Sequence, residues 1–155
     1  MRADGQADRC RWLTRRARYG STVLVIDASV LAVALLDDGP DGDAARNRLH
    51  GEQLTAPALI DLEVASVWRG LARGGHLDPR RVGFALDDLR ELPLQRVAHA
   101  PLLARCWELR DNLTIYDAAY VALAEALQAT LITGDRRLGR STGPQCAIEV
   151  LKTTR

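Results

Sequence analysis

The chain has 155 residues, which is enough for one domain with a substantial core and too few for two ordinary domains. Its hydrophobic fraction of 47%, charged fraction of 26% and net charge of +1 are ordinary for a globular protein and exclude a strongly basic nucleic-acid binder. It lacks an apolar run of the roughly 20 residues that a membrane helix needs, an apolar signal-peptide core and the cysteine pattern of a disulfide framework. We therefore expect a cytoplasmic protein with no membrane association.

The first 22 residues differ in composition from the rest of the chain. They carry six arginines and two aspartates, a charge of +4, whereas the remainder carries fifteen basic and eighteen acidic residues, a charge of −3. A basic arm that touches phosphates, a short amphipathic helix and an upstream translation start all fit this composition. We favour the upstream start, because the first clear structural element begins at Val23. The sequence thus predicts an Arg-rich extension over 1–22, disordered or an artefact of the start site, and one domain over 23–151.

From Val23 onward, short apolar runs alternate with helical periodicity and turn signals. In chain order, the predicted elements are a strand over 23–26, helices over 28–36 and 43–49, a strand over 54–56, helices over 58–73 and 79–90, a strand over 94–97, helices over 101–110 and 114–128, and strands over 130–133 and 147–151. Strands separated by helices are typical of an α/β/α sandwich with a central, mainly parallel sheet.

Four acidic residues stand at the ends of these apolar segments or inside them, where a carboxylate is most costly to bury. They are Asp27 after the first strand, Glu63 in a helix that is apolar most of the way round, Asp117 at the start of an alanine-rich helix, and Asp135 after the fourth strand. Sites in parallel sheets form at the carboxyl ends of strands, so all four can meet at one edge of the sheet. Buried carboxylates need hydrogen bonds or a counter-charge, and a hard divalent cation bound through oxygen supplies one.

Each acid also has an ordinary structural explanation. Asp27 fits a helix N-cap, Asp117 fits the third position of a capping box, and Asp135 follows a glycine as turn residues do. Glu63 could extend into solvent, and Asp61 is its rival on another flank of the same helix. Only the joint pattern of the four acids favours a functional site.

Four segments around these acids resemble a known family, the PIN domain, and within it the VapC-type toxins of bacterial toxin–antitoxin pairs. The segments are VIDAS over 25–29, APALIDLEV over 56–64, TIYDAAYVALA over 114–124 and LITGDRRL over 131–138. They occur in the family's order, the resemblance extends over nearly all of 23–151, and none of the four acids departs from the pattern. The motifs around Asp117 and Asp135 are the most specific.

The resemblance implies a hydrolase, a Mg²⁺- or Mn²⁺-dependent ribonuclease that arrests growth by cleaving RNA. Asp27 and Asp117 would be the principal direct metal ligands. Glu63 and Asp135 would bind a metal directly or through water, and one of them would orient the attacking water. One or two such ions can supply the nucleophile, charge relief at the phosphoryl oxygens and a stabilised leaving group.

Other residues are expected to support this chemistry. Ser29 and Thr133 stand where they could hydrogen-bond a carboxylate or a metal-bound water. Positive groups that follow the motifs are candidates for RNA contacts, namely Arg69, Arg73, Arg136, Arg137 and Arg140, with a solvated helix face the better interpretation for Arg73.

The resemblance also implies three partners: an RNA substrate, a second copy of the chain in a homodimer, and a cognate VapB-type antitoxin. Family antitoxins lay a tail along a groove between toxin helices, which here would be bordered by 58–71 and 43–49. Operon DNA would be contacted only through the antitoxin. The alternative to an enzyme is a non-catalytic PIN-like module that binds RNA or protein. A receiver or haloacid-dehalogenase-like phosphotransfer fold lacks its late lysine or second aspartate here, and a related DNA nuclease would need a longer chain.

Overall fold

The computed structural model describes residues 22–152, so the Arg-rich segment predicted over 1–22 lies outside the described residues apart from Thr22. Five parallel strands form one sheet in the order β3-β2-β1-β4-β5. Their bounds are β1 (Val23–Ile26), β2 (Gln53–Pro57), β3 (Leu94–Val97), β4 (Thr130–Thr133) and β5 (Ile148–Val150). The predicted central parallel sheet is confirmed, and every strand pair within it is parallel.

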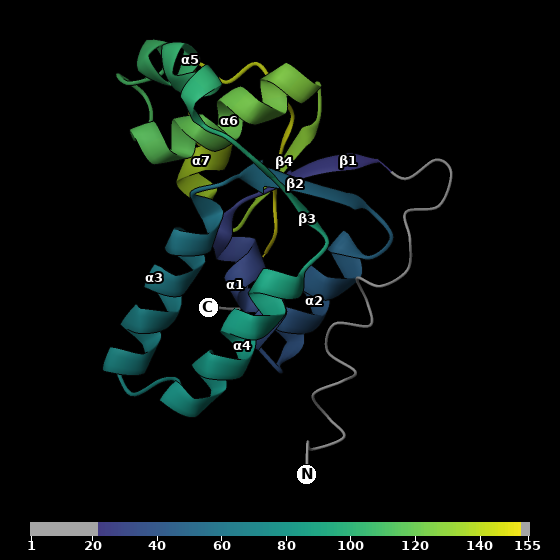
Figure 1. Ribbon diagram of the computed structural model, residues 1–155. Helices are drawn as coiled ribbons and strands as arrows, with labels where there is room; N and C mark the ends of the chain where they lie inside the picture. The colour runs from purple at the N-terminus through teal and green to yellow at the C-terminus, as the bar shows by residue number, and fades with distance from the viewer. Residues whose placement is uncertain (1–21, 153–155) are drawn as a thin grey trace.

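Helices cover both faces of this sheet, as Figure 1 shows. One layer consists of α1 (Ala28–Leu36), α2 (Pro40–Leu49), α3 (Ile60–Arg73) and α4 (Pro79–Glu91). The other contains the 3₁₀ helix η1 (Ala100–Leu102), α5 (Leu103–Glu108) and α6 (Ile115–Leu127), and the short α7 (Arg136–Arg140) follows β4. The α/β/α sandwich is therefore confirmed. Within residues 22–152, no helix has both the length and the apolar character to cross a membrane.

Capping residues explain why most predicted helix boundaries hold to within two residues. The Asp78 carboxylate accepts a hydrogen bond from the Arg80 N–H at 2.9 Å and starts α4. Gln128 ends α6 in the left-handed conformation, with φ of 51°. α2 begins at Pro40, three residues earlier than predicted, because proline suits the first helical turn. The helix predicted over 101–110 is divided into η1 and α5.

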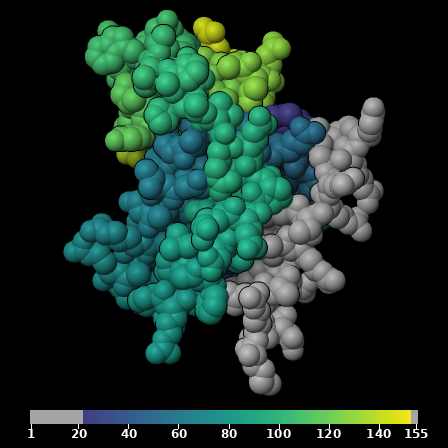
Figure 2. Space-filling view, viewed as in Figure 1, coloured from purple at the N-terminus to yellow at the C-terminus, as the bar shows by residue number. Residues whose placement is uncertain are grey.

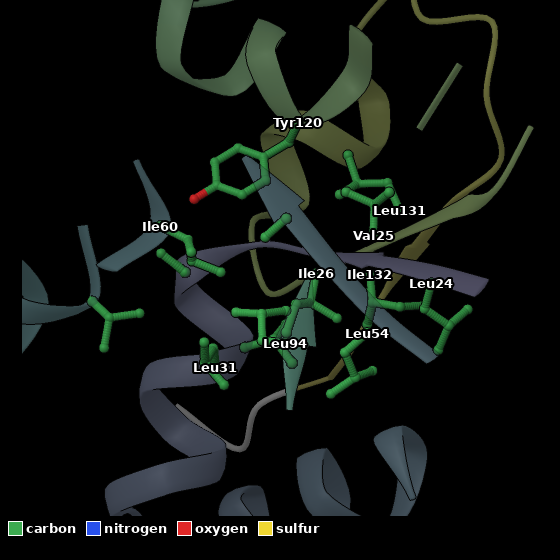
Figure 3. Packing of buried hydrophobic residues seen from close by; sticks show 14 of the residues in the cluster. Leu24, Val25, Ile26, Leu31, Leu54, Ile60, Leu94, Tyr120, Leu131 and Ile132 are labelled. Atoms are coloured by element: carbon green, nitrogen blue, oxygen red, sulfur yellow. The ribbon is translucent and has the colours of Figure 1, made fainter. Parts of the chain in front are cut away.

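The core lies on both sides of the central strands (Figure 3). Leu24, Val25 and Ile26 of β1 are at most 1% exposed, as expected for a strand that is covered on both faces. α3, in contrast, buries only the stripe Ile60, Val64 and Trp68, so the expectation that it is apolar most of the way round was wrong. Glu63 lies at the edge of that stripe and is half-buried.

Two glycines in helices should respond in opposite ways to alanine. A Cβ at Gly42 would lie 1.9 Å from the Asp37 carbonyl oxygen at the end of α1, whereas a Cβ at Gly70 of α3 would meet nothing within 4 Å. We expect Gly42→Ala to lower the free energy of unfolding by about 1–3 kcal/mol through overpacking. Gly70→Ala should raise it by up to about 1 kcal/mol through helix propensity. Urea unfolding measures both, and a Gly42→Ala variant as stable as wild type would contradict the predicted packing of α2 on α1.

Candidate functional site

The site lies where the strand order reverses. β1 stands between β2 and β4, and the connections that leave β1 and enter β4 run over opposite faces of the sheet. In open α/β sheets this topology opens a crevice at the carboxyl ends of the two strands. Asp27 directly follows β1, and its backbone N–H donates to the Ile132 carbonyl of β4 at 3.0 Å. In Figure 2 the outline of the molecule is indented between the green lobe of α5 and α6 and the blue α3.

Asp27 is the buried centre of the site, with 9% of its surface exposed. Its Oδ1 accepts a hydrogen bond from the Ser29 N–H at 2.6 Å, and its Oδ2 accepts one from the Thr133 hydroxyl. The Thr133 hydroxyl oxygen in turn accepts from the Asp135 N–H at 3.0 Å, and the Ser29 hydroxyl oxygen accepts from the Gly134 N–H at 2.9 Å. Ser29 and Thr133 therefore fix the orientation of the Asp27 carboxylate and tie the start of α1 to the end of β4.

Three of the four predicted acids interact electrostatically. Burial raises the pKa of Asp27, and the charge of Asp117 adds to this, while hydrogen bonds from Thr133 and Ser29 act in the opposite direction. Burial also raises the pKa of Glu63, the Tyr120 hydrogen bond opposes it, and the charges of Asp27 and Asp117 add to it. No Arg, Lys or His within residues 22–152 forms a salt bridge with any of these three carboxylates. The described residues therefore concentrate negative charge at the site without a directly paired cationic side chain.

Asp117 combines a structural and an electrostatic role. Its N–H donates to the Thr114 Oγ1 at 3.1 Å, and the Thr114 hydroxyl donates to the Asp117 Oδ2 at 2.8 Å, so Asp117 belongs to the cap of α6. The same half-buried carboxylate raises the pKa of both Asp27 and Glu63. Asp117 can therefore cap α6 and belong to the group of interacting acids at the same time.

Asp135 is set apart from the other three acids. It is the N-cap of α7, where its Oδ1 accepts from the Arg137 N–H at 2.7 Å, and it forms an ion pair with the Arg137 guanidinium at 3.2 Å. Partial burial raises its pKa, but the hydrogen bonds and charge of Arg137 outweigh burial, so the pKa is lowered overall. Its link to Asp27 runs through Thr133. Arg137 also interacts electrostatically with Asp117, so this arginine faces two of the acids.

Asp61, the rival of Glu63 on α3, has a different partner. The Arg96 guanidinium of β3 donates to both Asp61 carboxylate oxygens, at 2.7 and 2.9 Å. This bidentate pair joins α3 to the edge of the sheet. Glu63 is therefore the acid of α3 that faces the site.

Tyr120 is the member of the site that sequence reasoning missed. It was treated as part of the apolar run that follows Asp117, yet its hydroxyl donates to the Glu63 Oε2. The spacing of three residues from Asp117 places both side chains on one side of α6, and this spacing was the available signal. α7 was also missed, because five residues are too few to show helical periodicity.

The donor set suits a hydrated divalent cation better than a closed cage. No three His, Cys, Asp or Glu side chains in the described part of the chain are arranged to hold a metal ion. The interacting acids offer only carboxylate oxygens, and Mg²⁺ is commonly held by one or two carboxylates while it keeps several waters. Asp27 is a buried carboxylate without a counter-ion, which such a cation would provide.

Comparison with known proteins agrees with this geometry. The PIN domain family model matches residues 24–143, and the chain belongs to this family. Ribonuclease VapC9 of Mycobacterium tuberculosis is 45% identical over 132 residues, which cover 83% of this chain and 98% of that protein. The chain is thus a PIN domain of the VapC type.

Two solved structures share the fold. PAE2754 from Pyrobaculum aerophilum gives a TM-score of 0.60 at 23% identity and covers 89% of this chain and 92% of its own. VapBC2 from Rickettsia felis, solved bound to a DNA fragment from its promoter, gives a TM-score of 0.59 at 15% identity and covers 83% and 98%.

The raised pKa of Asp27 predicts how stability depends on pH without metal. Between its unfolded-state pKa and its raised folded-state pKa, Asp27 is protonated when folded and ionised when unfolded, so rising pH favours unfolding. In EDTA, we expect the unfolding free energy of wild type to fall more than that of Asp27→Asn as pH rises through this window. The difference between the unfolding free energies of the two proteins then reports the titration of Asp27 together with its coupling to Glu63. Parallel pH profiles for the two proteins would show that Asp27 titrates normally.

Proposed function

We propose that this protein is the toxin of a type II toxin–antitoxin pair, an endoribonuclease that uses Mg²⁺ or Mn²⁺ to hydrolyse RNA phosphodiester bonds. RNA cleavage in the cytoplasm would inhibit translation and growth. The observation that carries the proposal is the group of interacting carboxylates at the switch point, Asp27, Glu63 and Asp117, in a domain whose curated relatives are named ribonucleases.

Asp27 and Asp117 are the residues that we propose to hold the cation directly. Glu63 and Asp135 would reach it directly or through water, and Asp135 is the more remote because Arg137 engages it. When bound, the cation would supply charge relief at the phosphoryl oxygens and a more acidic water. Thr133 and Ser29 keep Asp27 in one orientation, so little reorganisation would be needed on binding.

Glu63 is the best candidate to orient the attacking water. One of its oxygens accepts the Tyr120 hydrogen bond, and the other accepts none from residues 22–152. Its raised pKa also makes it a better proton acceptor than an ordinary glutamate.

RNA would approach over α7. Arg136, Arg137 and Arg140 are exposed there, as are Arg69 and Arg73 on α3. Arg137 is the strongest candidate for a phosphate contact, because it already faces Asp135 and Asp117. Each phosphate contact should add to the salt dependence of RNA binding.

A non-catalytic binding module is the less favoured alternative. Such a module has no need for a buried carboxylate without a counter-ion, which destabilises the metal-free fold. The names of the curated relatives favour catalysis as well.

The antitoxin is the second part of the proposal. A cavity of about 280 Å³ lies between α1, α3 and α4. Its apolar lining is Ala32, Val33, Leu36, Val67, Leu71 and Leu77. The sequence predicted a groove between α3 and α2. In the structure, α3 borders the cavity, but α2 contributes only Asp41 and α4 only Arg81; α1 and the loops that follow α1 and α3 supply the other lining residues. We propose that the antitoxin tail occupies this cavity, and that operon DNA is contacted by the antitoxin alone.

We also propose a homodimer. Large apolar side chains on α5 and α6 are exposed, with Trp107 at 63%, Leu103 at 52% and Leu127 at 44%. A second copy of the chain is the partner that would cover them.

The nuclease proposal predicts a charge-specific loss of activity. Asp27→Asn should lower metal-dependent RNA cleavage by at least about 100-fold. Losing a metal ligand should lower activity more than losing a side chain that only supports a ligand. Asp87→Asn on α4, which removes an exposed charge of the same kind, should cleave at the wild-type rate. Gel assays with purified protein and Mn²⁺ measure both, and full activity of Asp27→Asn would refute the assigned site.

The antitoxin proposal predicts that inhibition and cleavage can be separated. Leu71→Glu places a charge in the cavity, two helical turns from Glu63, and should weaken binding of the cognate antitoxin about tenfold or more, with cleavage unchanged. Leu86→Glu is the control, because Leu86 is exposed on α4 but does not line the cavity. Calorimetry measures the two affinities, and equal binding by both variants would place the antitoxin elsewhere.

A further inference from the structure

Tyr120 is a buried polar residue that links two acids of the site. Its side chain is 2% exposed, and it lies three residues after Asp117 on α6. Its hydroxyl donates to the Oε2 of Glu63 on α3, 57 residues away in the chain. Figure 3 shows the ring above the central strands with its hydroxyl directed toward the segment of Ile60.

The hydroxyl also lies next to the start of α1. Burial, the hydrogen bond to Glu63 and the charges of Glu63 and Asp27 all raise the pKa of Tyr120, while the Ala28 backbone N–H acts in the opposite direction. Ala28 is the residue directly after Asp27. The hydroxyl therefore interacts with the two segments that carry Glu63 and Asp27 and is itself carried by the helix of Asp117.

Glu63 depends on this one contact for its orientation. Within residues 22–152, its carboxylate accepts a hydrogen bond from no other donor and forms no salt bridge. A glutamate side chain has three rotatable bonds, so without a fixed partner it would sample several positions. With Oε2 occupied by Tyr120, Oε1 is the oxygen left for the site.

Packing alone does not explain this residue. A phenylalanine would fill the same space, whereas a buried hydroxyl must find a partner or destabilise the fold. Here the partner is a carboxylate that belongs to the site and not a backbone carbonyl of the core.

We propose that Tyr120 is a positioning residue whose hydroxyl holds Glu63 in place beside Asp27 and Asp117 and leaves the Glu63 Oε1 free to act. The inference rests on the proposed metal-dependent nuclease function. It assigns Tyr120 no contact with RNA or with the reacting atoms. Its effect is exerted through Glu63.

The test is Tyr120→Phe, which removes only the hydroxyl, with Tyr116→Phe on the exposed side of the same helix as the matched control. We expect the Mn²⁺ affinity of Tyr120→Phe, measured by calorimetry without RNA, to fall about tenfold, and kcat to fall by a similar factor with little change in KM. Tyr116→Phe should match wild type in both. Wild-type Mn²⁺ affinity and kcat in Tyr120→Phe would overturn the inference.

A double-mutant cycle distinguishes positioning from a general effect on the fold. If Tyr120 acts through Glu63, adding Tyr120→Phe to Glu63→Gln should cause no further loss of Mn²⁺ affinity or kcat. Independent, multiplicative losses would overturn the inference. Glu63→Asp, which keeps the charge but withdraws the carboxylate from the hydroxyl, tests the same contact if Tyr120→Phe does not fold. Wild-type Mn²⁺ affinity in Glu63→Asp would count against the proposal.

The failure of this inference can be told from failure of the nuclease proposal. If Asp27→Asn loses Mn²⁺ binding and cleavage while Tyr120→Phe keeps both, only the role of Tyr120 is refuted. If Asp27→Asn binds Mn²⁺ and cleaves RNA like wild type, the proposed function falls and the inference falls with it.

Discussion

The burial of the Asp27 carboxylate is the constraint around which the rest of the site is organised. A carboxylate that is 9% exposed needs hydrogen bonds, and the fold supplies them from both sides of the switch point, through Ser29 on α1 and Thr133 on β4. These bonds hold the group but do not neutralise it, because no cationic side chain of the described residues pairs with it. The fold thus carries a destabilised charge at the carboxyl ends of the paired strands β1 and β4, and a bound cation is the simplest compensation.

The α6 helix organises the other two acids of the group. Its first turn presents Asp117, held by the Thr114 cap, and its next turn presents Tyr120, which reaches across to Glu63 on α3. One rigid helix therefore sets both a carboxylate and the contact that orients a second one. Asp135 differs from these acids because it caps α7 and forms an ion pair with Arg137, which compensates its charge. The site is asymmetric: within residues 22–152, Asp135 forms an ion pair and the other three acids form none, although the Arg137 charge also acts on Asp117.

The α1 helix connects this site with the cavity that we assign to the antitoxin. Asp27 caps its first turn, and Leu36 and Asp37 at its other end line the cavity. Ala32, the first residue of α1 that lines the cavity, lies five residues after Asp27, roughly 7–8 Å along the helix axis, and Leu36 lies roughly 13–14 Å along it. A partner in the cavity would therefore sit near the site without having to enter it, which suits inhibition by a tail that extends from one region to the other.

The sequence by itself determined the elements and the places where acids follow them. Strands 23–26 and 130–133 and the helix over 28–36 have the predicted bounds, because their apolar runs end at strong capping or turn residues. Strand 94–97 also has the predicted bounds, although Gln95 and Arg96 interrupt its apolar pattern. Only the tertiary structure decided which acids meet, since these choices depend on contacts between distant segments: Thr133 with Asp27 over 106 residues, Tyr120 with Glu63 over 57, and Arg96 with Asp61 over 35. Local periodicity places a side chain on a face of its own helix. The partner on that face is supplied by another part of the chain, so Asp61 became a structural ion-pair partner and Glu63 a member of the site.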